Sequence, residues 1–400
     1  MQHSLQSNTN FFKTDFCLRL ASQVLEDEAP KGVNFVASPL SIHVILSLIA
    51  AGSTGKTLEQ LLFFLGSPSL SHLNLMSSQL ISLISKVSGS GNHTGGPLLS
   101  FTNGAWVDAR FNLKPSFEEI VKGSYKAKIE NVDFVNKPDQ AVDEVNSWAE
   151  NATKGLIKQI LRYGCVDDNT ILILANALYF KGSWDQKFDA RKTRDSYFHL
   201  LNGKTVQVPF MTSKINELQL HLYRCFDGFK VLQIPYKSGQ EPNRFSMYFF
   251  LPDKKDGLLN LTRMIKRNPA MLNQDFGLTK DKLTDFWIPK FKFSFDFEAS
   301  KTIEKMGLNG PFYPGGLKNI VDCTNASEKL IVSKIFHKSF IEVDEEGTEA
   351  AAVTAAICVP ICFINYPSFV ADHPFLFMIR EETSKVVFFV GAVLNPLLQS

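Results

Sequence analysis

A run of small residues near the C-terminus constrains the fold of this chain more than any other feature. Residues 348–356 read TEAAAVTAA and follow an acidic run that ends at Gly347. Because nearly every side chain is small, the run has neither an apolar helical face nor enough to bury for a core strand. It is either an exposed Ala-rich helix or loop, or a segment that enters a narrow slot.

The slot interpretation rests on the alternation of side chains along a strand. As a strand, the run would leave Glu349 on one face and put only small, uncharged side chains on the other. That second face would carry Thr348, Ala350, Ala352, Thr354, Ala356 and Cys358. The pattern suits a loop that can join an existing sheet.

The composition is that of a soluble globular protein, with 44% hydrophobic and 20% charged residues. A length of 400 residues alone suggests two or three domains. No Pro/Ser-rich linker divides the chain, so we expect one domain over residues 1–400. The 34 Phe residues predict an aromatic-rich core. A net charge of +2 gives no general attraction to nucleic acid or membranes, and we expect neither as a partner.

The N-terminal residues have no apolar core of a signal peptide, and no apolar run reaches the roughly 18 residues of a membrane helix. The six cysteines are scattered without a framework spacing. We therefore expect free thiols in a reducing compartment. The predicted location is cytoplasmic or nuclear, with leaderless export left open.

Local patterns predict a mixed α+β chain. Ser38 and Pro39 are typical of a helix start, the apolar run 170–180 predicts a central strand, and Asn202-Gly203 predicts a hairpin turn. Residues 85–100 are Ser/Gly-rich and predict a surface loop. We expect helices at 11–25, 40–51, 57–65, 116–122, 138–161, 257–265 and 300–306. We expect strands at 34–37, 99–107, 128–134, 170–180, 204–211, 218–223, 229–235, 245–251, 284–297, 331–342 and 375–393.

Four motifs occur in a fixed order along the chain. They are NFVASPLS at 34–41, NALYFKGSW at 176–184, FHK at 336–338 leading to EEGTEAAA at 345–352, and FVADHPF at 369–375. Together they resemble the serpin family, and its plant branch in particular, over roughly residues 10–396. The resemblance implies one α+β domain with three β-sheets, about nine helices and an exposed reactive centre loop at about 347–369.

The resemblance also implies a suicide inhibitor of endopeptidases. The protease attacks the loop as a substrate and forms an acyl-enzyme. The loop then inserts into the main sheet before water can release the protease, so the active fold persists for kinetic reasons. The expected partner is a serine or papain-like cysteine endopeptidase, and the protein is expected to be a monomer.

The family's spacing from Gly347 places the reactive bond at Ile361–Cys362, although cleavage one or two bonds away is an alternative. No Lys or Arg occurs between Ala350 and Ala371, which argues against trypsin-like targets and favours proteases that accept an apolar residue. The resemblance makes a hinge of Glu345, Glu346, Gly347, Thr348, Glu349, Ala350, Ala351 and Ala352. It places Ser38, Ser41, Asn176 and His337 in a buried cluster under the opening sheet, and Trp184 where insertion begins.

Two other functions compete with inhibition. The chain has no G-x-S-x-G, HExxH, phosphate loop or dinucleotide fingerprint, so we expect no enzyme, cofactor or metal. A non-inhibitory serpin that acts as a binding or chaperone-like protein is the stronger alternative. The small, uncharged side chains of Thr348, Ala350 and Ala352 in the hinge argue against it, whereas Ile361–Cys362 is not an obvious cleavage site for a protease.

Overall fold

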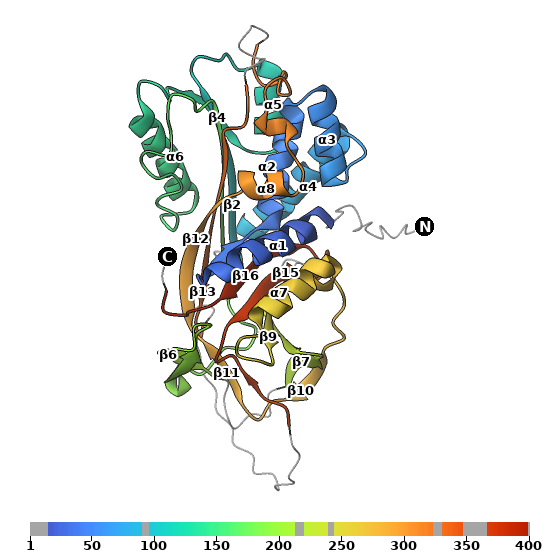
Figure 1. Ribbon diagram of the computed structural model, residues 1–400, viewed down its shortest axis with the longest axis vertical. Coiled ribbons are helices and arrows are strands. Elements are labelled where there is room, and N and C mark those ends of the chain that lie inside the picture. The colour runs from blue at the N-terminus through green and yellow to red at the C-terminus, as the bar shows by residue number, and fades with distance from the viewer. Residues whose placement is uncertain are drawn as a thin grey trace.

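The computed structural model describes residues 15–89, 96–212, 220–238, 244–322, 330–346 and 366–398, without the side chains of 83 and 85–89 (Figure 1). Of the predicted hinge it includes Glu345 and Glu346. Residues 347–352 and the predicted reactive bond Ile361–Cys362 lie outside the described residues.

The described chain folds into eight α-helices and three β-sheets, close to the helix number that the resemblance implied. The helices are α1 (Asp15–Glu28), α2 (Pro39–Gly52), α3 (Gly55–Leu65), α4 (Leu70–Gly89), α5 (Pro115–Ser124), α6 (Pro138–Ala152), α7 (Leu258–Arg267) and α8 (Ser300–Lys305). No helix in this part of the chain is long and apolar enough to cross a bilayer.

The five-stranded sheet runs along the long axis of the molecule, above the strands of the other two sheets (Figure 1). Its strands, in spatial order, are β12 (Phe291–Glu298), β13 (Lys334–Val343), β4 (Leu172–Lys181), β2 (Leu98–Asp108) and β3 (Lys128–Val132). The apolar run that predicted a central strand is β4, which is buried except at Lys181. β13 pairs parallel with β4. On either side, β12 pairs antiparallel with β13, and β2 pairs antiparallel with β4.

Two further sheets complete the fold. The seven-stranded sheet has the order β1 (Phe35–Ala37), β16 (Val387–Val393), β15 (Phe375–Glu381), β9 (Phe245–Pro252), β8 (Phe229–Pro235), β7 (Leu220–Phe226) and β10 (Thr279–Lys282). The four-stranded sheet has the order β14 (Phe369–Val370), β11 (Phe286–Pro289), β6 (Thr205–Met211) and β5 (Arg194–His199). The predicted hairpin at Asn202-Gly203 joins β5 to β6, and Gly203 has a φ of 79°.

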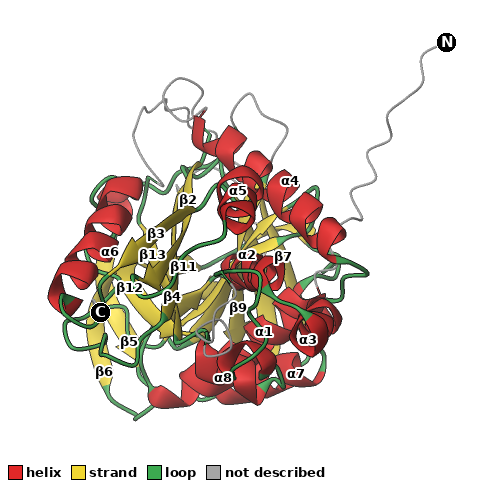
Figure 2. Cartoon of the chain, turned by 90° about the horizontal axis from the view of Figure 1, so that it is seen from above, coloured by secondary structure: helices red, strands yellow, loops and turns green. Residues whose placement is uncertain are grey.

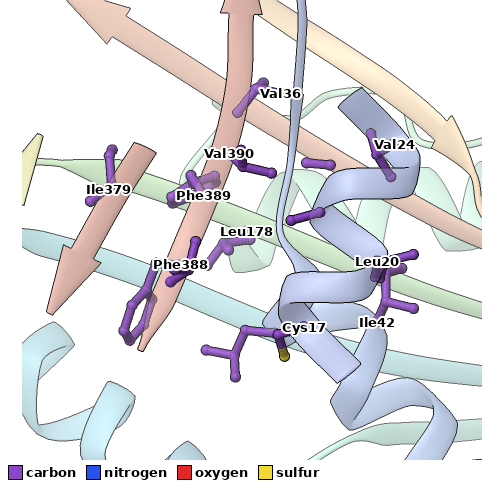
Figure 3. Close-up of a cluster of buried hydrophobic side chains, with 14 of the residues drawn as sticks. Cys17, Leu20, Val24, Val36, Ile42, Leu178, Ile379, Phe388, Phe389 and Val390 are labelled. Atoms are coloured by element: carbon purple, nitrogen blue, oxygen red, sulfur yellow. The ribbon is translucent and has the colours of Figure 1, made fainter. Parts of the chain in front are cut away.

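The five-stranded sheet separates two apolar clusters. The larger cluster includes residues from Phe16 to Leu394 and packs α1 and α2 against β4 and β16 (Figure 3). All of α2 is buried, which suits a helix that is apolar on almost every side. The smaller cluster lies under α6, which covers the other face of the sheet (Figure 2).

Three predicted elements were wrong in extent. Helix α4 extends to Gly89 and β2 begins at Leu98, so half of the predicted loop at 85–100 belongs to regular elements. Leu73, Met76, Leu80 and Ile84 are buried at helical spacing in α4, but frequent serines obscured this pattern.

The predicted helix 138–161 ends at Ala152, because Lys154 and Gly155 adopt φ angles of 54° and 82°. The predicted strand 284–297 is two strands, β11 and β12, which belong to different sheets. Continuous Phe-rich alternation conceals the break between Pro289 and Phe291.

Candidate functional site

The parallel contact between β4 and β13, here called the seam, is the candidate functional site. It runs from Lys334 opposite Ile173 to Phe340 opposite Tyr179. At its midpoint His337 lies opposite Asn176, and both side chains are buried. The seam therefore has polar groups inside an otherwise apolar sheet, and buried polar groups need hydrogen-bond partners.

His337 is held by hydrogen bonds on both ring nitrogens. The backbone N–H of Ser38 lies 3.0 Å from Nε2, and Asn176 Oδ1 lies 3.0 Å from Nδ1. Because a backbone N–H can only donate, Nε2 must accept, and Nδ1 carries the proton. The Ser339 hydroxyl, 2.6 Å away, is a second donor to Nε2. The contacts select the neutral ring, and burial lowers the pKa of His337 to about 3.

Asn176 extends this network towards β2. Its amide nitrogen donates to Asn103 Oδ1 at 2.9 Å and to the Thr102 carbonyl at 3.1 Å. The network thus links β13, β4 and β2 with the start of α2. Anything that separates β4 from β13 must break the contact between His337 and Asn176.

Ser38 and Ser41 belong to the start of α2. Ser38 Oγ accepts from the Ser41 N–H at 3.2 Å, which is the N-cap that the sequence predicted. Ser41 Oγ is buried and has no hydrogen-bond partner among the described residues. The Ser41 hydroxyl is therefore a buried polar group close to the network of His337 that forms no hydrogen bond with a described residue.

Trp184 marks the end of the seam at which β13 leads to the hinge. Its indole Nε1 donates to the Asp344 carbonyl at 2.8 Å, and its ring stacks on Tyr236 with centroids 4.5 Å apart. The indole is 2% exposed. Trp184 therefore anchors the last described residues before Gly347.

Glu345 is fixed by charge as well as by hydrogen bonds. One carboxylate oxygen lies 2.6 Å from Lys290 Nζ and the other accepts from the Thr193 hydroxyl at 2.6 Å. Burial alone would raise the pKa of Glu345, but the hydrogen bonds from Lys290 and Thr193 outweigh it and lower the pKa. The Glu345 carbonyl also accepts from the Phe188 N–H at 3.0 Å. The hinge thus starts from a firmly held residue.

The outer face of the seam is covered by α6 and by the segment 153–171 that follows it, here called the strap. Asn146 of α6 binds the strap through hydrogen bonds to the backbone of Ile160 and Leu161. The cluster beneath includes Ala175 and Ala177 of β4, with Phe336 of β13 packed against it. The cover therefore spans both strands of the seam.

Two contacts tie the strap to the far side of the seam. Arg162 lies 3.1 Å from Asp296 of β12, and Lys334 of β13 donates to the Cys165 carbonyl at 2.6 Å. Asp296 also binds Lys338 of β13 at 2.6 Å. The strap is thus connected to strands that must move if the seam opens.

The structure brings the predicted residues together in two groups. Ser38, Asn176 and His337 share one hydrogen-bond network, with Ser41 as its neighbour in α2, and Trp184 lies with Glu345 and Glu346 at the hinge end. Sequence reasoning missed Asn103, Thr193 and Lys290. Lys290 and Glu345 are 55 residues apart, and no local pattern joins them. Among the described residues no group of His, Cys, Asp and Glu side chains could hold a metal ion.

Comparisons with known proteins agree with this geometry. The family model described as "Serpin (serine protease inhibitor)" matches residues 12–396. The chain belongs to the serpin family. This serpin is 48% identical to Serpin-Z3 of Arabidopsis thaliana over 94% of its own length and 95% of that protein, and 45% identical to Serpin-ZXA of Oryza sativa subsp. japonica over 96% and 97%.

The serpin fold is also found by comparison with solved structures. The structure of Arabidopsis AtSerpin1, titled as its native stressed conformation, superimposes with a TM-score of 0.88. That chain is 42% identical, and the match covers 99% of this serpin and 100% of AtSerpin1. The predicted fold and the predicted similarity to plant serpins are confirmed.

Proposed function

We propose that this serpin inhibits an endopeptidase irreversibly, by cleavage of its reactive loop and insertion of that loop into the seam. The observation that supports this most is the parallel pairing of β4 and β13. A segment that follows β13 and folds back runs antiparallel to β13, and therefore antiparallel to β4 as well. It can form antiparallel ladders on both sides, which are slightly more stable per residue than the parallel pairing they replace.

The side chains of residues 348–356 suit that position. In an inserted strand, Thr348 and the alanines at even positions would face inward towards the network of His337 and Asn176. Small, uncharged groups fit there, whereas a charge would be buried without a partner. Glu349 would face outward.

We propose a serine or papain-like cysteine endopeptidase as the partner, acting at Ile361–Cys362. Ile361 would occupy an apolar specificity pocket. The protein would act as a monomer, and its role would be that of a consumed substrate rather than of an enzyme. The serpin relatives support a protease as partner. The class of protease rests on the sequence of the loop.

The decisive experiment mixes the protein with elastase-like, chymotrypsin-like and papain-like proteases and analyses the products on a denaturing gel. An inhibitor gives a covalent complex that survives SDS. If every protease that cleaves the loop leaves only cleaved protein, the proposal is wrong and a binding role takes its place.

Thr348→Arg tests the insertion step. The arginine would have to be buried facing the polar network, so insertion of the loop should slow. Hydrolysis of the acyl-enzyme should then occur before insertion is complete. We expect cleaved product instead of complex. Glu349→Arg is the matched control, because that side chain would face outward and complex formation should persist. An undiminished complex with Thr348→Arg would contradict the inward assignment.

A further inference from the structure

A cavity of about 400 Å³ lies beside the seam, between α4, β2, β4 and the start of the strap. Its volume is within the roughly 300–1,000 Å³ of small-molecule sites. Most of its wall is apolar and comes from Ile81, Ile84, Leu98, Phe101, Leu156 and Tyr179. Such a wall favours a hydrocarbon chain over a polar ligand.

Lys154 gives the cavity a positive charge. This lysine adopts a φ of 54°, in the left-handed region at the end of α6, where glycine or asparagine is usual. A left-handed lysine costs about 1 kcal/mol relative to glycine. A strained residue is often retained for function, and here the strain accompanies a side chain that lines the cavity.

The charges around the cavity favour an anion. From Leu70 to Val107, which covers α4 and all of β2 except its last residue, Asp108, the sequence contains no Asp or Glu. Lys154 is exposed and makes no ion pair with any described residue. Glu342 is close enough to help raise the pKa of Tyr179 to about 12, after burial, but it is itself paired with Lys292 at 3.1 Å.

The walls of the cavity are joined by hydrogen bonds, so the cavity is preformed. The Ser100 hydroxyl of β2 donates to the Ala152 carbonyl at 2.8 Å. Thr153 Oγ1 donates to the Ala149 carbonyl at 2.7 Å and accepts from the Ile157 N–H at 2.9 Å. A ligand would bind without first ordering these elements.

We propose that this cavity binds a medium- or long-chain carboxylate, with its hydrocarbon chain against the apolar wall and its carboxylate at Lys154 Nζ. This site is separate from the reactive loop and does not depend on the proposed inhibitory function.

Isothermal titration calorimetry of the full-length protein with decanoate, below its micelle concentration, tests the proposal. We expect saturable binding of one decanoate per protein. 1-Decanol, which has the same chain without the charge, should bind about fivefold more weakly, the upper end of what an ion pair with an exposed lysine contributes. Absence of saturable decanoate binding, or equal affinity for decanol, would overturn the proposal.

Three variants locate the site. Lys154→Gly removes the charge while suiting the left-handed backbone, so the fold is retained and decanoate should bind about fivefold more weakly. Lys158→Gln removes an exposed lysine that does not line the cavity, and this variant should bind decanoate with the affinity of the unaltered protein. Leu156→Trp, at a half-exposed wall residue, should block binding. Unchanged affinity in Lys154→Gly or in Leu156→Trp would refute the site.

Discussion

His337 joins the two central strands through a ring that must stay neutral. Its folded pKa of about 3 is below the ordinary value of 6.5, so between these values the unfolded chain binds a proton that the folded chain does not. The contribution of the neutral His337 ring to the free energy of unfolding is complete above pH 6.5 and is lost as the pH falls towards 3. Burial lowers the pKa of His43 and His221 to about 4, which acts in the same direction.

We therefore predict that the free energy of unfolding falls between pH 7 and pH 5, and that His337→Gln makes this fall less steep. One histidine contributes a slope of up to about 1.4 kcal/mol per pH unit. Urea unfolding of both proteins at pH 7, 6 and 5 measures the slopes. Equal slopes would show that His337 is not held neutral.

Lys290 and Lys292 offer a matched comparison of two ion pairs near the hinge. The Glu345 side chain that binds Lys290 is 10% exposed, whereas Glu342, which binds Lys292, is 40% exposed. Lys290→Met leaves a nearly buried carboxylate with Thr193 as its remaining side-chain partner, and should destabilise the protein by about 1–3 kcal/mol. Lys292→Met should cost under about 1 kcal/mol. Denaturant midpoints of the two variants give the comparison, and equal losses would contradict it.

At the scale of elements, the strap covers the outer face of the seam and contacts β12 and β13. Asp296→Asn weakens the contacts of β12 with both Arg162 and Lys338. If the loop inserts as proposed, we expect faster insertion and fewer serpin molecules cleaved for each protease trapped. Asp15→Asn, which disrupts an exposed pair on α1, is the control. Gel quantification of complex against cleaved product measures the ratio, and an unchanged ratio would remove the strap from the mechanism.

Elements with local signals could be predicted from the sequence. Ser38 and Pro39 start α2, and Asn202-Gly203 turns between β5 and β6, because each signal acts within a few residues. The true end of α6 was missed because Ile157, Ile160 and Leu161 continue the helical apolar spacing beyond the left-handed pair Lys154 and Gly155. The pairing of β4 with β13 joins segments more than 150 residues apart, so no local pattern predicts it. The resemblance to a family predicted only that Asn176 and His337 belong to one buried cluster.

For the whole molecule, the arrangement predicts that cutting the loop raises stability. A strand added between β4 and β13 would replace one parallel ladder by two antiparallel ladders, and each additional hydrogen bond contributes about 0.5–1.5 kcal/mol net. We expect Tm to rise by about 10 °C or more after cleavage between residues 355 and 362. Calorimetry before and after limited proteolysis measures the change. A Tm that stays the same or falls would mean that the loop does not insert.

The hydrogen bond between Trp184 and the Asp344 carbonyl gives this molecule an optical reporter at a useful position. The chain has four tryptophans, and this one binds the residue that directly precedes the hinge acids. Indole emission depends on polarity and on neighbouring rings, here the stacked Tyr236. A step that displaces Asp344 from Trp184 would change the surroundings of that indole. The protein's own ultraviolet fluorescence can therefore follow the rate of that step without an attached dye.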